Sequence, residues 1–223
     1  MSARTVSKLI LKDWHLHRIA ILSTVGGSVL AILLVFLPGG GLVNMGASLA
    51  IAMLVTVTFY LPLASVLEER HDKTLTFLMG LPISPSEYVA SKILGNLTIF
   101  LFPWLTLVAG VTLLPAAEVS RSLGSGFVPV VLLGIVLIFS IVLGFSLITE
   151  SGGWTVALIV TLLFLTSNVV TEVIPDTPAV RETIQSIASR GSAFWSALTI
   201  EGFLIVLVLA ATFFAQSRKR DFL

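Results

Sequence analysis

Six long stretches without charged residues divide this chain of 223 residues, and they limit its fold more than any other feature. A hydrocarbon core of about 30 Å needs about 20 apolar residues in a helix, and most of the stretches come close to this length. Because lipid offers no partner to backbone N–H and C=O groups, each stretch must form a helix. The sequence therefore predicts an all-α integral membrane protein, a single transmembrane domain over residues 1–223. Its six spans are expected at about 19–37, 49–67, 93–114, 128–148, 154–170 and 195–215.

The composition excludes a soluble domain of this size. Hydrophobic residues make up 56% and charged residues 11% of the chain, whereas an ordinary soluble domain carries roughly 25% charged residues. The basic first 18 residues have no cleavage-like site after the first span, so we expect that span to stay in the protein. With no cysteine, the chain can form neither a disulfide framework nor a thiolate metal site.

Basic residues are unevenly divided between the two sides of the predicted membrane. Ten of the thirteen Lys and Arg residues lie at the termini or in the loop between spans two and three. By the positive-inside rule, both termini are cytoplasmic, and the protein is a multi-pass protein of the cell membrane. An even number of spans also places both termini on one side, so the two arguments agree.

Residues 4–17 are predicted to form an amphipathic helix on the inner membrane surface. Two explanations fit this helix equally well: an anchor for span one, or an element that transmits movement from a cytoplasmic partner. Its apolar side carries Val6, Leu9, Ile10 and Trp14. Its polar side carries Lys8, Lys12 and His15.

The loop between spans two and three combines charge with exposed apolar residues. Residues 68–73 are six ionisable residues in succession, and each would cost roughly 2.5 to 3.5 kcal/mol at mid-bilayer, so they must lie outside the membrane. Residues 74–79 are then predicted to form a short, partly apolar helix that ends at Gly80. Apolar residues on such a loop need lipid headgroups or a protein partner to cover them, which predicts a docking site.

The start of the third helix is marked by the sequence Ser84-Pro85-Ser86-Glu87. Ser84 is expected as the N-cap, Pro85 as the first helical residue and Glu87 as the third, an arrangement that satisfies amide groups of the first turn. The loop is therefore two helical pieces with defined ends.

Span six is too short by itself, because residues 202–215 reach only about 21 Å. Running the helix back through Phe194 and Trp195 gives an adequate length but places Glu201 in the outer third of the bilayer. A carboxyl group there is a candidate functional residue, although it can also be hydrogen-bonded to a neighbouring span. A helical element over 177–191 is expected on the outer surface before this span.

Several other polar side chains and two prolines fall within the spans. Pro62 and Pro103 are expected to bend or locally open spans two and three. Polar side chains in the spans are explained either by packing between helices or by a substrate path. The candidates for a substrate path are Tyr60, Asn96, Asn168 and Glu201.

The motifs of common catalytic sites are missing from the sequence. No glycine precedes a lysine, so the chain lacks the phosphate-binding loop that ends in Gly-Lys-Ser/Thr. The histidines are His15, His17 and His71, and no His-Glu-x-x-His pair is present to hold zinc. We therefore expect neither enzymatic activity, nor a metal site, nor a cofactor bound by this chain, nor a nucleic-acid partner.

The loop sequence resembles the ABC-2 type permease family of ATP-binding-cassette transporters. Within residues 67–92, an acid ends span two, a short Thr-Leu helix follows, and Leu-Pro-Ile-Ser leads to a Glu and a Lys that enter span three. Residues 9–14, Leu-Ile-Leu-Lys-Asp-Trp, also resemble the start of small permeases of this group. With six spans and inner termini, the resemblance covers essentially the whole chain.

This resemblance implies a transport subunit without a nucleotide-binding domain. Two copies, or two related subunits, would form the path as a homodimer or heterodimer, and two separate ABC ATPase subunits would bind ATP and Mg²⁺. A coupling helix would lie in the loop between spans two and three, and a second contact near Glu150. The residues implied in coupling to the ATPase are Glu68, Glu69, Asp72, Lys73, Thr74, Leu75, Phe77, Leu78 and Glu150.

Alternating access, driven by the ATPase, is the mechanism that the resemblance implies, with export as the direction. The scarcity of charge in the spans favours an amphipathic or hydrophobic cargo such as a lipid, peptide or antibiotic. Two alternatives stay open: a permease subunit of the haem-export type, for which a histidine on the outer side is missing, and a membrane scaffold or assembly factor that does not transport.

Overall fold

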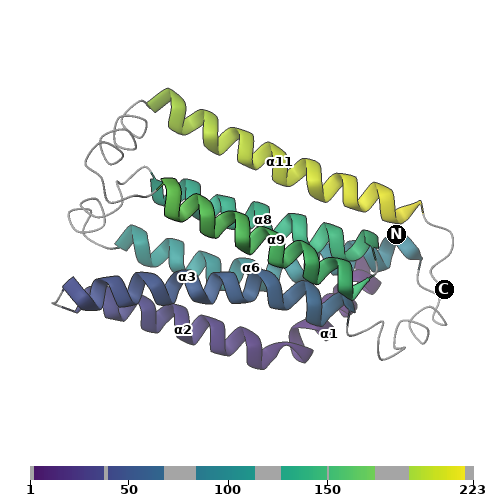
Figure 1. The fold of residues 1–223 in the computed structure, drawn as a ribbon. Helices are drawn as coiled ribbons and strands as arrows, with labels where there is room; N and C mark the ends of the chain where they lie inside the picture. The colour runs from purple at the N-terminus through teal and green to yellow at the C-terminus, as the bar shows by residue number, and fades with distance from the viewer. Residues whose placement is uncertain are drawn as a thin grey trace.

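Long helices that run alternately up and down form the described part of the chain, as the computed structural model shows (Figure 1). The structure describes residues 3–37, 40–67, 84–113, 127–149, 151–173 and 191–218. Helices account for nearly all of these residues, which confirms the predicted all-α class. In chain order they are α1 (Ala3–Leu16), α2 (Arg18–Phe36), α3 (Gly40–Pro62), the π-helix η1 (Leu63–Leu67), α6 (Pro85–Leu113), α8 (Phe127–Thr149), α9 (Gly152–Val173) and α11 (Gly191–Ser217).

Among the described residues, five helices are long and apolar enough to cross a membrane, which supports a multi-pass membrane protein. They are α2, α3 with the start of η1, α6, α8 and α11. The apolar part of α9 over Gly152–Leu165 is shorter than these, so a sixth span remains a prediction. The extension of the last span is confirmed, because its apolar segment runs over Phe194–Gln216.

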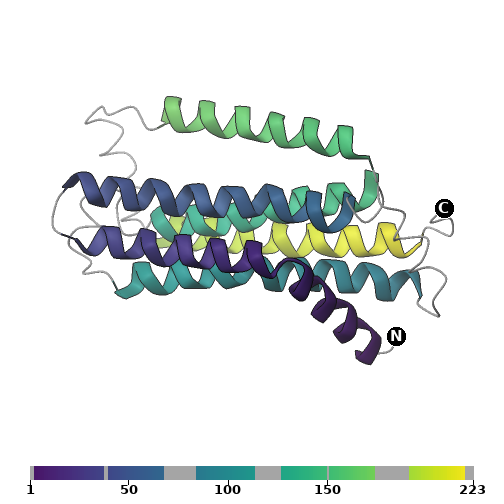
Figure 2. The same cartoon turned by 90° about the horizontal axis from the view of Figure 1, so that it is seen from below.

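Both α1 and the last turn of α11 lie at the same end of the bundle, which we call the α1 end (Figure 1). α1 meets α2 at His17 and turns away from the axis of α2 (Figure 2). The amphipathic character of α1 is confirmed, because Val6 is buried while Lys8 and Lys12 are exposed. Which side of the membrane this end faces remains a prediction.

The hydrophobic core lies between α3, η1, α6 and α8. Phe100 of α6 and Phe139 of α8 stack at its centre, with ring centroids 4.3 Å apart and planes 8° apart. Buried aliphatic residues such as Leu61, Leu143 and Leu147 surround this aromatic pair. Two of these elements, η1 and α6, also carry the polar residues described below.

Small residues allow two pairs of helices to approach closely. A Cβ atom built on Gly46 of α3 would lie 2.6 Å from the carbonyl oxygen of Ala31 on α2, which no real side chain tolerates. A Cβ atom on Gly144 of α8 would likewise collide with the hydroxyl group of Thr212 on α11. Close backbone contact through small residues is a common way for helices to associate in lipid.

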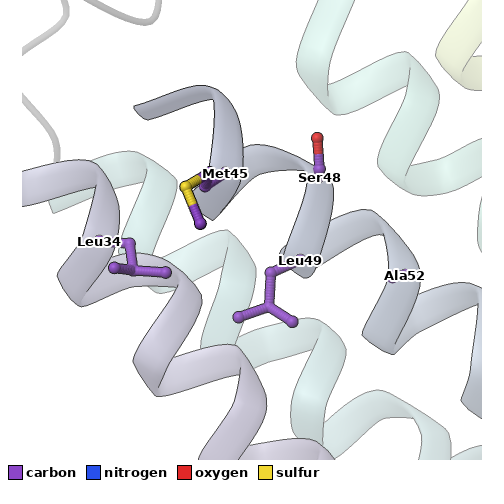
Figure 3. A pocket seen from close by; sticks show the side chains of 5 residues that line it. All are labelled: Leu34, Met45, Ser48, Leu49 and Ala52. Atoms are coloured by element: carbon purple, nitrogen blue, oxygen red, sulfur yellow. The ribbon is translucent and has the colours of Figure 1, made fainter. Parts of the chain in front are cut away.

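The outer faces of the bundle are apolar, as expected for a protein surrounded by lipid. Ile19 and Leu22 of α2 and Phe203 of α11 are exposed, and α9 runs along one edge of the bundle with α8 and η1 as its neighbours (Figure 2). A shallow depression lies between α2 and α3 (Figure 3). Because its lining is apolar apart from one hydroxyl group, it suits lipid chains. The lining residues are Leu34, Met45, Ser48, Leu49 and Ala52.

The two prolines predicted to disturb helices behave differently. α3 ends at Pro62 and continues as the wider π-helix η1, a local opening that follows from the missing N–H group and the ring of proline. α6 remains α-helical through Pro103. The outer helical element expected over 177–191 lies outside the described residues, apart from its last residue.

Candidate functional site

α6 begins with the capping arrangement that the sequence predicts. The backbone N–H of Glu87 donates to the Ser84 hydroxyl group at 3.3 Å, and the backbone N–H of Ser84 donates to the Glu87 carboxylate at 3.1 Å. This reciprocal pair satisfies amide groups that the first turn of a helix leaves free. The start of α6 is thus fixed immediately after the predicted coupling segment.

A buried ion pair joins α1 to α6 at the α1 end. The ammonium group of Lys92 donates to both carboxylate oxygens of Asp13, at 3.0 and 3.2 Å. Each side chain is only 3% exposed, so water screens the attraction weakly. Lys92 also lies over the ring of Tyr88, with 5.9 Å from its ammonium nitrogen to the ring centroid.

Trp14 of α1 makes a second attachment to α6, nearly two turns beyond Lys92. Its indole N–H donates to the Thr98 hydroxyl group at 3.2 Å, and its ring meets that of Phe102 edge-on, 5.9 Å between centroids. Gly95 of α6 faces α1 here, since a Cβ atom there would lie in ordinary contact, 3.5 Å, with a carboxylate oxygen of Asp13. α1 therefore lies against α6 over about two turns.

Hydrogen bonds continue from Lys92 to the π-helix. The amide nitrogen of Asn96 donates to the carbonyl oxygen of Lys92 at 2.8 Å, and the Ser65 hydroxyl group donates to the Asn96 amide oxygen at 2.7 Å. Asn96 is 1% exposed, so these bonds satisfy it within the bundle. We call Asp13, Lys92, Asn96 and Ser65 the polar chain. It connects α1, α6 and η1.

Most of the polar chain escaped the sequence analysis. Lys92 and Asp13 entered only as parts of the two segments that resemble the permease family, and neither was given a role. The signal was present, because residues 6, 10, 13 and 17 recur at helical spacing on one side of α1, and position 13 places a carboxylate on that buried side. Pairing Asp13 with a residue 79 positions away needed the tertiary structure.

Glu201, the candidate in the last span, lies on the other half of the molecule. It packs against α8 at Gly134, where a Cβ atom would be 3.5 Å from one of its carboxylate oxygens. The other carboxylate oxygen is buried and has no hydrogen-bond partner among the described residues. An unsatisfied carboxyl group at such a depth is costly in free energy, which makes it a candidate for binding a ligand or a proton.

The remaining candidates for the substrate path are separated in space from Glu201 or lie outside the described side chains. Tyr60 is 43% exposed on α3, and its ring meets that of buried His17 edge-on, 6.3 Å between centroids. Asn168 lies in α9, and its side chain is outside the described part of the structure. The described surroundings of the other three candidates differ: Tyr60 contacts His17, Asn96 accepts from Ser65, and Glu201 lies beside Gly134.

The residues expected to couple to an ATPase are outside the described residues. This holds for Glu150 and for the whole segment 68–83. Their flanks are described: η1 ends at Leu67, and α6 begins at Pro85. In the described parts of the chain, no group of three or more His, Asp and Glu residues is placed to hold a metal ion.

The chemistry of these two places differs. The polar chain satisfies its own charges and holds three elements together, whereas Glu201 has a carboxyl group available for interaction. A family model described as ABC-2 family transporter protein matches residues 8–217. No curated protein and no solved structure matches the chain.

Proposed function

The chain belongs to the ABC-2 transporter family, and from this premise we propose that it is the permease subunit of an ATP-binding-cassette exporter driven by separate ATPase subunits. The observation that carries the proposal is the extent of the family match, which runs from α1 to the end of α11. The apolar spans of the bundle are in keeping with it.

Coupling to the ATPases is proposed at residues 68–79, with a second contact at Glu150. Both ends of this loop lie at the α1 end of the bundle, since α3 leads into η1 and α6 starts from its capping box. A segment held between two such anchors is suited to pass a displacement to the spans. We propose that this end faces the cytoplasm, where ATP is available.

The assembly is proposed to contain two permease subunits and two ATPases. α2 and α11 expose large apolar side chains, among them Leu33, Phe36 and Val206. Lipid or a second permease, as homodimer or heterodimer, would cover these faces. Nucleotide binding by the ATPases would then shift the permease between inward-open and outward-open states, because only nucleotide distinguishes the two states in free energy.

An amphipathic or hydrophobic cargo fits the described spans better than a small ion. Their interior is mainly apolar, and the charged groups of the polar chain are paired with each other. Glu201 offers one carboxyl group that could bind a basic or hydrogen-bonding headgroup while the apolar part of the cargo contacts neighbouring helices. Tyr60, Asn96 and Asn168 remain candidates for other parts of the path.

Co-purification with ATPases encoded in neighbouring reading frames tests this proposal. The complex is placed in liposomes, and its ATP hydrolysis is compared with that of the isolated ATPase. Glu69→Arg and Leu75→Asp should weaken ATPase binding or abolish the stimulation, because they reverse a charge or place one on an apolar contact.

The matched controls are Glu69→Gln and Leu75→Ile, which keep the size and polarity of each site and should leave the stimulation nearly intact. A chain that binds no ATPase, or whose complex is insensitive to both disruptive variants, would contradict the proposed function and favour a scaffold.

A further inference from the structure

The Asp13–Lys92 pair is withdrawn from water although it lies only about 10 Å from the start of α6 at Pro85. Two hydrophobic residues of similar size could pack there at least as favourably, because burying charges carries a desolvation penalty. What an ion pair adds is a fixed geometry. The two contacts of 3.0 and 3.2 Å allow one relative position of α1 and α6, whereas apolar side chains can slide past each other.

The same residues extend this fixed geometry to the element before the coupling segment. The side chain of Asn96 donates a hydrogen bond to the carbonyl oxygen of Lys92 and accepts one from the hydroxyl group of Ser65. Ser65 belongs to η1, which ends one residue before position 68. Each member of the polar chain is buried, so the three elements are connected without intervening solvent.

We propose that Asp13 and Lys92 are positioning residues for energy coupling: they hold α1, the first turns of α6 and η1 in one unit, so that a displacement at residues 68–79 moves these elements together. The inference rests on the proposed function, because it requires an ATPase that acts on this loop. Without the pair, α1 slides along α6, and part of the displacement is lost before it reaches the spans.

A double variant separates this role from folding. Asp13→Asn combined with Lys92→Met removes both charges of the pair, so neither of the two is left buried without the other, and the bundle should still assemble. In the liposome complex, we expect ATPase binding to persist while the stimulated ATP hydrolysis falls about fivefold or more, the lower end of typical coupling between sites.

An engineered disulfide provides the rescue. A Cβ atom at Gly95 would lie 3.9 Å from the Cα atom of Ile10, so the two backbones pass each other at close range and Ile10→Cys with Gly95→Cys is the pair chosen for the cross-link. The natural chain has no cysteine, so no other disulfide bond can form within the variant chain. In the double variant, the oxidised cysteine pair should restore the stimulated hydrolysis, and reduction should remove it again.

Three controls complete the experiment. The natural complex under the same oxidant and reductant reports any redox sensitivity of the ATPase itself. The cysteine pair with Asp13 and Lys92 intact should be active in both redox states. Size-exclusion chromatography and retained binding of the ATPase show that each variant is folded.

The inference is overturned if the folded double variant hydrolyses ATP like the natural complex, or if the oxidised disulfide restores nothing. In the first case the pair plays no part in coupling. In the second it acts in some other way than by holding α1 to α6. Failure of the natural chain to bind any ATPase contradicts the proposed function instead, so the two failures are distinguishable.

Discussion

Two acidic residues of this bundle, buried Asp13 and half-buried Glu201, have opposite surroundings. Asp13, at the α1 end, has both carboxylate oxygens on the ammonium group of Lys92. Glu201, on α11, has one buried oxygen without a hydrogen-bond partner among the described residues. The first acid is part of the structure that surrounds it. The second lies beside Gly134 of α8.

The difference teaches how a membrane protein of low charge content uses the few ionisable groups it keeps. A paired charge fixes geometry, and its removal exposes the partner to a large desolvation penalty. An unsatisfied carboxyl group lowers the stability of the fold, and such groups are expected at functional positions. Substitution of the two acids or their partners should therefore change stability with opposite signs.

The largest effect is expected for Lys92→Met alone. It removes the buried partner of the Asp13 carboxylate and leaves only the long contact to Lys12, so the free energy of unfolding should fall by about 3 to 5 kcal/mol. Reversible unfolding in mixed detergent micelles measures this loss. Lys12→Met is the matched control, because Lys12 is 4.0 Å from the same carboxylate but its side chain is 41% exposed, and an exposed pair contributes only about 0 to 1 kcal/mol.

A change of opposite sign is expected for Glu201→Leu. Removal of the unsatisfied carboxyl group should raise the free energy of unfolding by about 1 to 3 kcal/mol in the same assay, and transport of a basic amphipathic cargo should fall. Ile200→Leu, at an exposed neighbouring position, should change neither quantity. A loss of stability in Glu201→Leu would show that the carboxyl group has a partner beyond the described residues, and the contrast with Asp13 would then fail.

Substitution of Gly144 tests whether close packing, and not an ion pair, holds α11 to α8. Gly144→Ala places a Cβ atom against the hydroxyl group of Thr212 and should destabilise the protein by about 1 to 3 kcal/mol. Thr212→Ala in addition should recover much of this loss, because the Cβ atom of residue 212 would be 3.6 Å away. The unfolding assay on the double-mutant cycle measures the recovery.

Gly26→Ala is the control for this pair of variants, since nothing lies within 4 Å of a Cβ atom there. It should be neutral or slightly stabilising, in line with the helix propensities of the two residues. Additive losses in Gly144→Ala and Thr212→Ala would mean that the two helices are not in close contact at this point.

The smallest effect is expected at the start of α6. Ser84→Ala removes the acceptor for the Glu87 N–H group, and the free energy of unfolding should fall by about 1 kcal/mol. Ser84→Asp keeps an acceptor and should retain most of the stability. A loss as large as that of Lys92→Met would show that the cap, and not the ion pair, is the main anchor of this end.

Local features of the fold could be predicted because they depend on neighbours in the sequence. Apolar length predicted the five candidate spans of the described residues to within a few residues at most ends, and the Ser84–Glu87 cap followed from spacing alone. The one-sided apolar pattern of residues 4–17 likewise predicted α1. The prediction that the last span extends back past Phe194 followed from the thickness of the bilayer.

Site residues were harder, because their roles depend on helices that are distant in the sequence. Asn96 was expected to take part either in packing between helices or in a substrate path, and the residues next to it in the sequence did not indicate Ser65 as its partner. Asp13 and Lys92 were visible as charges, but their pairing arises only when α1 lies against α6. The expected coupling residues are outside the described part of the chain and stay predictions.

What the sequence determined by itself is the class of the molecule: in lipid, an apolar stretch of sufficient length has to become a helix, whatever its neighbours are. What only the tertiary structure decided is which buried charges are satisfied. That depends on the distance between atoms on different helices, and a change of a few ångströms separates a carboxylate held by an ammonium group from one left without a partner.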